Sequence, residues 1–230
     1  MPRGDQKMRR KIIALGIAGV ASMTKLTQGR GAEMTLPEGH QSGGIDLNPR
    51  LFTFVGGASG SWSVDRISAV VGDSSPRITR LEVVHGQARN LPGGTQWVLR
   101  GATSNVRYVN RAEQGSLVAK QVAPGRKEAV LAALIPIKKS AAWWELPQDE
   151  RRKIFEESSH YIAIGLKYLP AISRRLHHCR ELGETEPFDF LTWFDYAPEH
   201  LQAFEDLVGN LRATEEWKFV QREIDIRLIR

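Results

Sequence analysis

The sequence predicts an α+β fold with a ferredoxin-like unit, because of three patterns in its C-terminal part. Residues 188–196 (FDFLTWFDY) and 217–229 (WKFVQREIDIRLI) alternate their side chains as antiparallel strands with two different faces do. Between them, residues 201–211 place apolar side chains on one helical stripe. A further helical pattern precedes the first of these strands. Helices and strands in this order are typical of a ferredoxin-like α+β unit.

The elements before this part are shorter, and the folded part is expected to begin near Leu51. Turn-rich breaks, GDSSPR and NLPGG, separate the early segments. Residues 113–123 indicate a helix or a loop, closed by the turn pair Pro124-Gly125. Strands are expected over 51–57, 97–111 and 128–137, and residues 62–72 predict a further strand or an amphipathic segment.

The clearest helix is expected from Gln148, where two acidic residues follow at the positive end of the helix dipole. Apolar residues continue at helical spacing as far as Ile172. Pro170 should kink or restart this helix, because it lacks a backbone donor and clashes with the preceding turn. On this interpretation alone, the pair Arg174 and Arg175 would be two solvated helix charges.

Composition and charge exclude several classes of protein. The chain has 230 residues, 41% hydrophobic and 25% charged, which is ordinary for a globular protein. Much of its net charge of +6 lies near the start, so no basic stripe and no nucleic-acid partner are expected in the folded part. A single cysteine, Cys179, excludes an intramolecular disulfide and a cysteine-rich metal site. No apolar run reaches the roughly 18 residues that a membrane span needs.

Residues 1–48 are expected to lie outside the fold, as a basic leader and a Gly-rich linker. The run KMRRK from Lys7 precedes an apolar run, IIALGIAGVASM, of about the length of a secretory h-region. This pattern predicts a signal peptide of the twin-arginine kind and a periplasmic protein. The apolar run is short and no clear A-x-A cleavage site follows it, so a disordered basic extension of a cytoplasmic protein is the alternative.

Four separated segments together resemble the chlorite dismutase family, in particular its short-chain, dimeric branch. They are LIPIKKSAAWW from Leu134, RRKIFEESSHYIAIGLKYLPAISRRLHHCR from Arg151, FDFLTWFDYAPEH from Phe188 and RATEEWKFVQREIDIRLIR from Arg212. The resemblance covers residues 51–230 and is densest from Ile135 onward. Agreement of several segments in order and spacing is more specific than any single motif.

The resemblance implies an antiparallel β-barrel of paired ferredoxin-like units, flanked by helices, with a truncated first unit. The expected domain spans residues 49–230, with a truncated N-terminal half to about 134 and a heme-binding half over 135–230. The resemblance also implies a homodimer and heme b bound between the C-terminal sheet and the helices. The implied activity is an oxidoreductase that converts chlorite to chloride and dioxygen without an outside electron donor.

Matched position by position, the resemblance implies roles for single residues. Arg174 occupies the place of the distal arginine, whose forked donors would hold chlorite and the hypochlorite formed from it. Coproheme decarboxylases of the family generally lack this arginine, so Arg174 favours the chlorite-converting branch. The other implied heme-pocket residues are Lys139 beside a propionate, Trp143 and Trp144 beside the heme, Thr192 and Phe194 in the distal pocket, and Glu216 as hydrogen-bond acceptor for the iron ligand.

One residue departs from the family pattern. The iron-binding histidine of the family lies thirteen residues before the distal arginine, and this chain has Tyr161 there (174 − 13 = 161). A phenol binds iron as tyrosinate, so its pKa, which is near 10 when unperturbed, must be lowered. Glu216 should have the opposite effect, because it accepts a hydrogen bond from the neutral phenol. His160 is the substitute candidate, but it would need a register shift or a π-bulge. The third possibility, after ligation by Tyr161 or by His160, is heme that is held only by its propionates and by packing. A non-catalytic or weakly active heme-binding paralogue is therefore the alternative to the enzyme.

Overall fold

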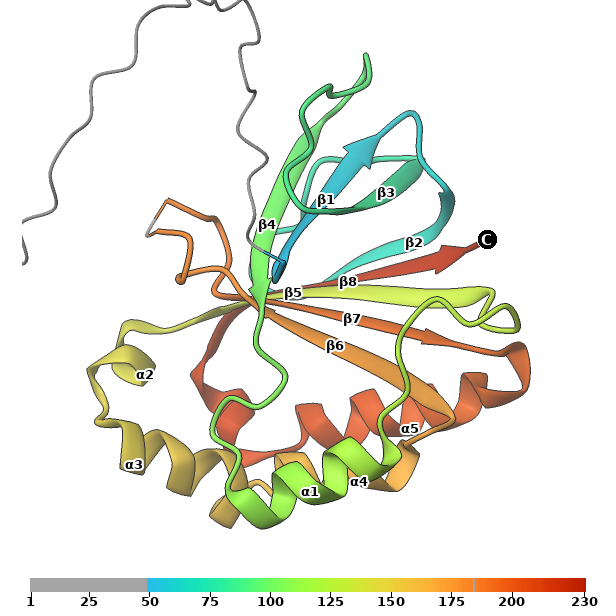
Figure 1. The fold of residues 1–230 in the computed structure, drawn as a ribbon. Coiled ribbons are helices and arrows are strands. Elements are labelled where there is room, and N and C mark those ends of the chain that lie inside the picture. Colours follow the sequence, from blue (N-terminus) through green and yellow to red (C-terminus); the bar gives the residue numbers. More distant parts are fainter. Residues whose placement is uncertain (1–48, 184) are drawn as a thin grey trace, which may run out of the picture. The chain divides into compact units, whose positions relative to one another are not determined.

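An antiparallel barrel is the framework of residues 49–183 and 185–230, the part of the chain that the computed structural model describes (Figure 1). The strands close in the order β1-β3-β2-β8-β5-β7-β6-β4, and all neighbours are antiparallel. This architecture confirms the predicted α+β barrel, whereas the expected leader over 1–48 lies outside the described residues. The strands are β1 (Leu51–Gly57), β2 (Trp62–Val71), β3 (Arg80–His85), β4 (Trp97–Thr103), β5 (Leu131–Lys139), β6 (Ile172–His178), β7 (Phe190–Tyr196) and β8 (Val220–Ile229).

Helices lie on one side of the β5–β8 strands, and β1–β3 lie on the other (Figure 1). Because the first strands contribute to the barrel without a helix layer of their own in the described part, they fit a truncated first unit. None of the described helices is both long enough and apolar enough to cross a membrane. The α-helices are α1 (Arg111–Lys120), α2 (Ala141–Glu145), α3 (Gln148–Arg152), α4 (Tyr161–Tyr168) and α5 (Leu201–Arg212), joined by a π-helical segment, η1 (Lys153–Ser158), and two 3-10 segments, η2 (Pro198–His200) and η3 (Glu215–Phe219).

Two apolar cores lie on opposite faces of the β5–β8 strands. Since successive side chains of a strand face opposite ways, β7 sends Trp193 into the barrel and Phe194 towards the helices. Every residue of β7 is buried as a result. The barrel core includes Phe54, Trp62, Leu81, Leu134, Leu191 and Ile226, and the helix-side core includes Ile135, Trp143, Tyr161, Phe204, Leu207 and Leu211.

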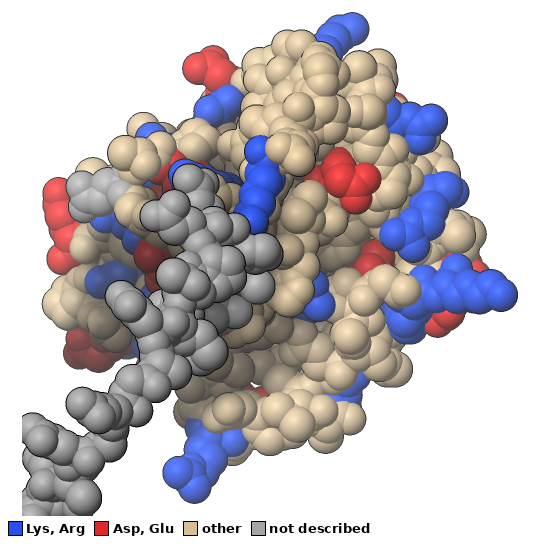
Figure 2. Space-filling model, turned by 45° about the horizontal axis from the view of Figure 1, so that its top comes forward, with Lys and Arg blue, Asp and Glu red and all other residues tan. Residues whose placement is uncertain are grey.

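The face of β8 beneath α5 is charged and buried. Glu223, Asp225 and Arg227 alternate along this strand and are 0%, 2% and 6% exposed. Arg212 of α5 links two of them, with Nη2 2.6 Å from Glu223 Oε1 and 2.9 Å from Asp225 Oδ2. Arg227 in turn binds Glu205 of α5, at 2.7 Å. Sequence reasoning identified only the apolar face of this strand. On the outer surface, by contrast, side chains of both charges are interspersed over the face shown in Figure 2.

Most of the predicted strands are confirmed, with shifted ends. The segments predicted from residues 51 and 62 are β1 and β2, and the two alternating segments near the C-terminus are β7 and β8. The strand predicted over 97–111 is too long, because β4 ends at Thr103 and the chain soon enters α1. The strand predicted over 128–137 begins at Leu131 and runs to Lys139. β3 was not predicted at all, since its six residues lie between two turn-rich breaks.

The predicted helix from Gln148 to Ile172 is wrong in its last part. Residues Ile172–His178 form strand β6, which pairs with β7 on one side and with β4 on the other. Leu169 has extended backbone, as a residue before proline usually does. Arg174 and Arg175 are therefore not helix charges. On a strand they face opposite sides, Arg174 the helix layer and Arg175 the barrel.

Candidate functional site

The expected site residues gather between the outer face of β5–β7 and the helix layer. Arg174 and Phe194 line one pocket there together with Tyr161. Tyr161 also lines two neighbouring pockets, and so lies where the three meet. The first of these neighbours is lined by five expected residues, Lys139 at the end of β5, Trp143 of α2, Tyr161 at the start of α4, Thr192 of β7 and Glu216 of η3.

Two expected residues lie outside these pockets. Trp144 is half-buried beside the site, where its ring stacks on Phe190 at 6.0 Å between centroids and its Nε1 donates to Asp189 at 3.3 Å. The guanidinium of Arg180 covers the same indole at 4.3 Å. His160 is exposed and lines none of the described pockets of this layer. In this conformation the structure does not bring the substitute ligand candidate to the site.

A break in the helix ahead of Tyr161 explains where His160 points. The π-helical segment η1 ends at Ser158, and His160 then takes a left-handed backbone with φ 53° and ψ 34°. The carboxylate of Glu156 caps the new helix by accepting the backbone N–H of Ile162 at 2.6 Å. On the inner side, the buried Ser159 hydroxyl accepts the backbone N–H of Glu216 at 2.9 Å. A π-helical segment thus precedes His160, but the chain after it presents Ser159 and Tyr161, not His160, to the interior.

Lys139 and Glu216 form a buried ion pair beneath the pocket. Each residue is 4% exposed, and the Lys139 ammonium donates to a carboxylate oxygen of Glu216. Burial lowers the pKa of Lys139, and the negative charge of Glu216 counteracts this effect. The ammonium also lies 5.1 Å from the centre of the Trp143 ring. Lys139 thus has a protein partner 77 residues away in the sequence, and its expected contact with a propionate stays a prediction.

The phenol of Tyr161 is held in its neutral form. Burial raises its pKa to about 12, the charge of Arg174 opposes that rise, and the charges of Glu216 and Glu223 add to it. The ring stacks on Phe155 at 4.4 Å between centroids. The expectation that Glu216 favours a neutral phenol agrees with this direction, although burial is the larger cause.

Arg174 is a half-buried cation on the same side of the sheet. Its guanidinium carbon lies 5.9 Å from the centre of the Tyr161 ring. A Cβ built on Gly165 of α4 would lie 3.9 Å from its Nη1, so the side chain reaches across to the helix. Gln121 fixes the backbone here by donating to the Arg174 carbonyl at 2.8 Å. The pocket between β6 and α4 therefore has a forked donor that suits a small oxyanion.

The walls of this site are largely apolar and aromatic, as the surroundings of a porphyrin are, whereas Tyr161 does not fit as an iron ligand. A neutral phenol is a poor ligand, because iron binds the deprotonated form. Some buried polar atoms at the first pocket, Trp143 Nε1, Thr192 Oγ1 and Glu216 Oε2, have no hydrogen-bond partner among the described residues. A bound group with polar substituents would satisfy atoms of this kind.

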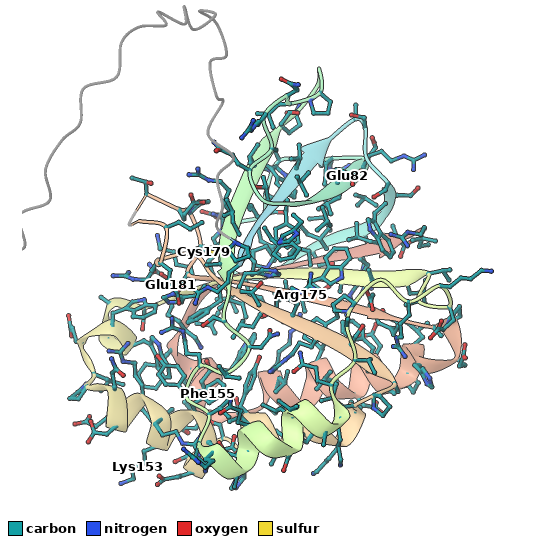
Figure 3. All side chains as sticks on the ribbon, in the orientation of Figure 1. Glu82, Lys153, Phe155, Arg175, Cys179 and Glu181 are labelled. Atoms are coloured by element: carbon teal, nitrogen blue, oxygen red, sulfur yellow. The ribbon has the colours of Figure 1, made fainter. Side chains whose placement is uncertain are left out.

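Several wall residues were not predicted from the sequence. They are spread over more than a hundred positions, and only the fold brings them together. Their common signal is aromatic or aliphatic character, which also suits an ordinary core. These residues are Tyr108, Ile137, Phe155, Leu176, Phe190 and Trp217. Figure 3 shows one of them, Phe155, within the helix layer.

Comparisons with known proteins agree with these observations. The family model described as chlorite dismutase matches residues 92–229. A dimeric chlorite dismutase from Nitrobacter winogradskyi has a similar structure, with 57% identity, a TM-score of 0.70, and coverage of 78% of this chain and 99% of that chain. A mutant chlorite dismutase from Candidatus Nitrospira defluvii is 19% identical, with a TM-score of 0.57 over 78% of this chain and 90% of that one, which is a likeness of fold alone. The chlorite dismutase of Ideonella dechloratans is 35% identical over 88 residues, which make up 38% of this chain and 28% of that protein.

Proposed function

Because this chain belongs to the chlorite dismutase family, we propose that it binds heme b between β5–β7 and the helix layer and converts chlorite to chloride and dioxygen. The observation that carries the proposal is the position of Arg174, half-buried at a pocket of this layer and 5.9 Å from the ring of Tyr161. Its forked donors suit a small oxyanion, and no general base is needed to hold one. Relatives that are named chlorite dismutases support chlorite as the substrate.

The chain's own residues would hold the cofactor by packing. When bound, heme would supply the iron at which an oxygen atom leaves chlorite. Trp143, Thr192 and Phe194 would contact the ring, because they line the pockets beside Tyr161. The buried pair of Lys139 and Glu216 would orient whatever side chain occupies the proximal position, since Glu216 keeps one carboxylate oxygen without a partner.

Tyr161 favours a second candidate, a heme-binding paralogue with little or no turnover. A buried phenol with a pKa of about 12 keeps its proton at neutral pH, so iron would have to displace that proton to bind it, which an imidazole does not require. We therefore expect weaker heme binding and slower chlorite conversion than in relatives that carry histidine at this position.

The decisive experiment compares the full chain with Tyr161→His. Heme is titrated into each protein and followed by the Soret band, and oxygen release from chlorite is measured with an electrode. Tyr161→His should bind heme more tightly and release more oxygen. Tyr168→His is the matched control, because it adds a histidine to the same helix at a half-buried site where the hydroxyl binds Asn210 at 2.9 Å. It should behave as the wild type does.

Each result decides between the candidates. Wild-type protein that already matches Tyr161→His in heme affinity and oxygen yield would contradict the argument from the missing ligand. Tyr161→His that binds heme and releases no oxygen would contradict chlorite as the substrate and leave the heme-binding candidate. Adding Arg174→Gln to Tyr161→His should reduce the oxygen yield by about tenfold or more while the Soret band persists.

We further propose a homodimer and a periplasmic location. The Nitrobacter winogradskyi relative is described as dimeric, which supports the first. Equilibrium sedimentation of the full chain tests it, and a monomer at micromolar concentration would contradict it. The basic and apolar runs near the start support the second. N-terminal sequencing of the mature protein after cell fractionation tests that location.

A further inference from the structure

A second cavity lies inside the barrel, on the face of the sheet opposite to Tyr161. It has a volume of about 140 Å³, opens to solvent beside Arg230, and is lined from β1, β2, β3, β6, β7 and the turn at Pro124-Gly125. Arg175 of β6, labelled at the β5–β8 strands in Figure 3, is one of its lining residues. A cavity of this size is about large enough for a single six-membered aromatic ring. None of the proposed heme-site residues lines it.

Aromatic side chains form a large part of its walls. Trp193 lies edge-on to Trp62 at 5.3 Å and tilted against Phe54 at 6.0 Å. Phe52 and Phe54 each lie 5.1 Å from the ring of His177. Walls of this kind offer ring faces and edges to a flat ligand, and aromatic contacts stabilise a bound ring beyond the area that they bury.

Two guanidiniums also line the cavity. The guanidinium of Arg175 is half-buried over the Phe52 ring at 4.5 Å, and that of Arg230 covers the Trp62 ring at 4.5 Å at the exposed rim. Neither guanidinium makes a hydrogen bond or an ion pair with another described residue. Burial lowers the pKa of Arg175, and the negative charge of Asp195 counteracts this effect.

Asp195 is the acidic residue of the lining, and its oxygens are already engaged. Oδ1 accepts the hydroxyl of Ser173, and Oδ2 accepts the backbone N–H of Gly125 at 2.7 Å and the indole N–H of Trp193 at 3.3 Å. The carboxylate therefore holds the turn and the indole in place. The side chains of the lining thus include two guanidiniums and one carboxylate.

His177 adds a buried polar atom without a partner. The residue is 1% exposed, its Nδ1 donates to the Leu191 carbonyl at 3.0 Å, and its Nε2 has no partner among the described residues. Burial lowers the pKa of the imidazole to about 4, so the ring is neutral at pH 7 and Nε2 is an acceptor. Buried polar atoms are normally paired, so an unpaired nitrogen in a residue that lines a cavity favours a ligand or a water molecule there.

From the aromatic walls, the unpaired Arg175 and the unpaired His177 Nε2, we propose that the barrel interior is a second binding site, for a small aromatic carboxylate. The ring would lie against Phe52 and the edge of Trp193, and the carboxylate would accept from Arg175. A hydroxyl group on the ring could donate to His177 Nε2. The site is independent of heme, because β6 separates it from the pocket of Arg174.

Benzoate is the probe. Titration into the full chain, followed by calorimetry and by tryptophan fluorescence, should give one site per chain, because two indoles line the cavity. Arg175→Gln should weaken benzoate binding by about tenfold or more, since a charge-assisted hydrogen bond to a carboxylate is lost. Arg174→Gln is the matched control, because it removes the neighbouring charge on the other face of the same strand, and should leave benzoate affinity unchanged. Benzamide, the neutral analogue, should bind weakly and equally to all three proteins.

The alternatives give distinct results. Wild-type protein that shows no saturable benzoate binding would overturn the proposal. So would loss of binding in Arg174→Gln with retention in Arg175→Gln, since the ligand would then occupy the helix side of the sheet. Thermal unfolding checks that each variant is folded. Should Arg175→Gln not fold, Arg230→Gln at the exposed rim decides the matter: affinity weakened severalfold supports the proposal, and unchanged affinity overturns it.

Discussion

Acid should destabilise this fold through the buried imidazole of His177. Burial lowers its pKa in the folded chain to about 4, while the hydrogen bond from Nδ1 to the Leu191 carbonyl opposes this shift and the charge of Arg175 adds to it. In the unfolded chain the imidazole has its ordinary pKa of about 6.5. The unfolded state therefore binds a proton first as the pH falls. The stabilisation is complete above about pH 6.5 and is lost progressively as the pH falls towards 4.

The magnitude follows from the two pKa values. Where only the unfolded chain is protonated at this site, stability changes by about 1.4 kcal/mol per pH unit. Integrated from about pH 7.5 to about pH 5, His177 alone accounts for a loss of about 2 kcal/mol. The carboxylates and the other histidines also titrate, so the quantity to measure is a difference between wild type and variant.

His177→Asn is the suitable variant, because the asparagine amide can donate to the Leu191 carbonyl as Nδ1 does. Urea unfolding at about pH 7.5 and about pH 5 gives the loss of stability for each protein. The loss should be smaller in His177→Asn by about 2 kcal/mol, whatever the variant's stability at neutral pH. His160→Asn, which removes an exposed histidine, should show the wild-type loss. Equal losses in wild type and His177→Asn would refute the reasoning.

Two further predictions concern other buried groups. Arg212→Met should destabilise the fold by about 3–5 kcal/mol in urea unfolding, because it leaves the buried carboxylates of Glu223 and Asp225 without this partner. Arg222→Met, which removes donors to two backbone carbonyls and leaves no buried charge unpaired, should cost about 1–2 kcal/mol. A cost for Arg212→Met no greater than for Arg222→Met would contradict this. The pKa of Tyr161 is raised to about 12 in the folded chain, so the unfolded chain loses this proton first and stability falls as the pH rises above about 10. Tyr161→Phe should therefore lose about 1.4 kcal/mol less stability than the wild type between about pH 8 and pH 11. An equal loss in both proteins would show that the phenol ionises in the folded chain as readily as in the unfolded one.

The parts of the fold that could be predicted from sequence are those in which one strand face differs from the other, or in which a helix has one apolar stripe. β7 alternates between the two cores, and α5 buries Phe204, Leu207 and Leu211 on one stripe, so local patterns sufficed for both. β6 has polar pairs, Arg174-Arg175 and His177-His178, on both faces. Its strand character comes from pairing with β7 and β4, which no local pattern contains.

The site was predictable to a similar extent. The resemblance identified residues that the fold brings to one layer, among them Trp143, Thr192 and Glu216. It could not identify Tyr108 or Phe155, whose only sequence signal is that they are aromatic. Nor could it show that Lys139 already has a carboxylate partner, because that contact joins two segments 77 residues apart. Contacts of this kind depend on tertiary structure, so they are visible only once the chain is folded.

The alternation of β6 has a consequence for how this protein can change. Because neighbouring residues of a strand face opposite sides, a substitution at 174 should affect the pocket on the helix side and one at 175 the cavity in the barrel. An insertion or deletion of a single residue in the strand would act differently. It would turn every following side chain of the strand to the opposite face, so that Arg175 would face the helix layer and His177 would leave the barrel interior. Point mutations can thus change the pocket of Arg174 or the barrel cavity alone, whereas a change in the length of β6 disrupts both.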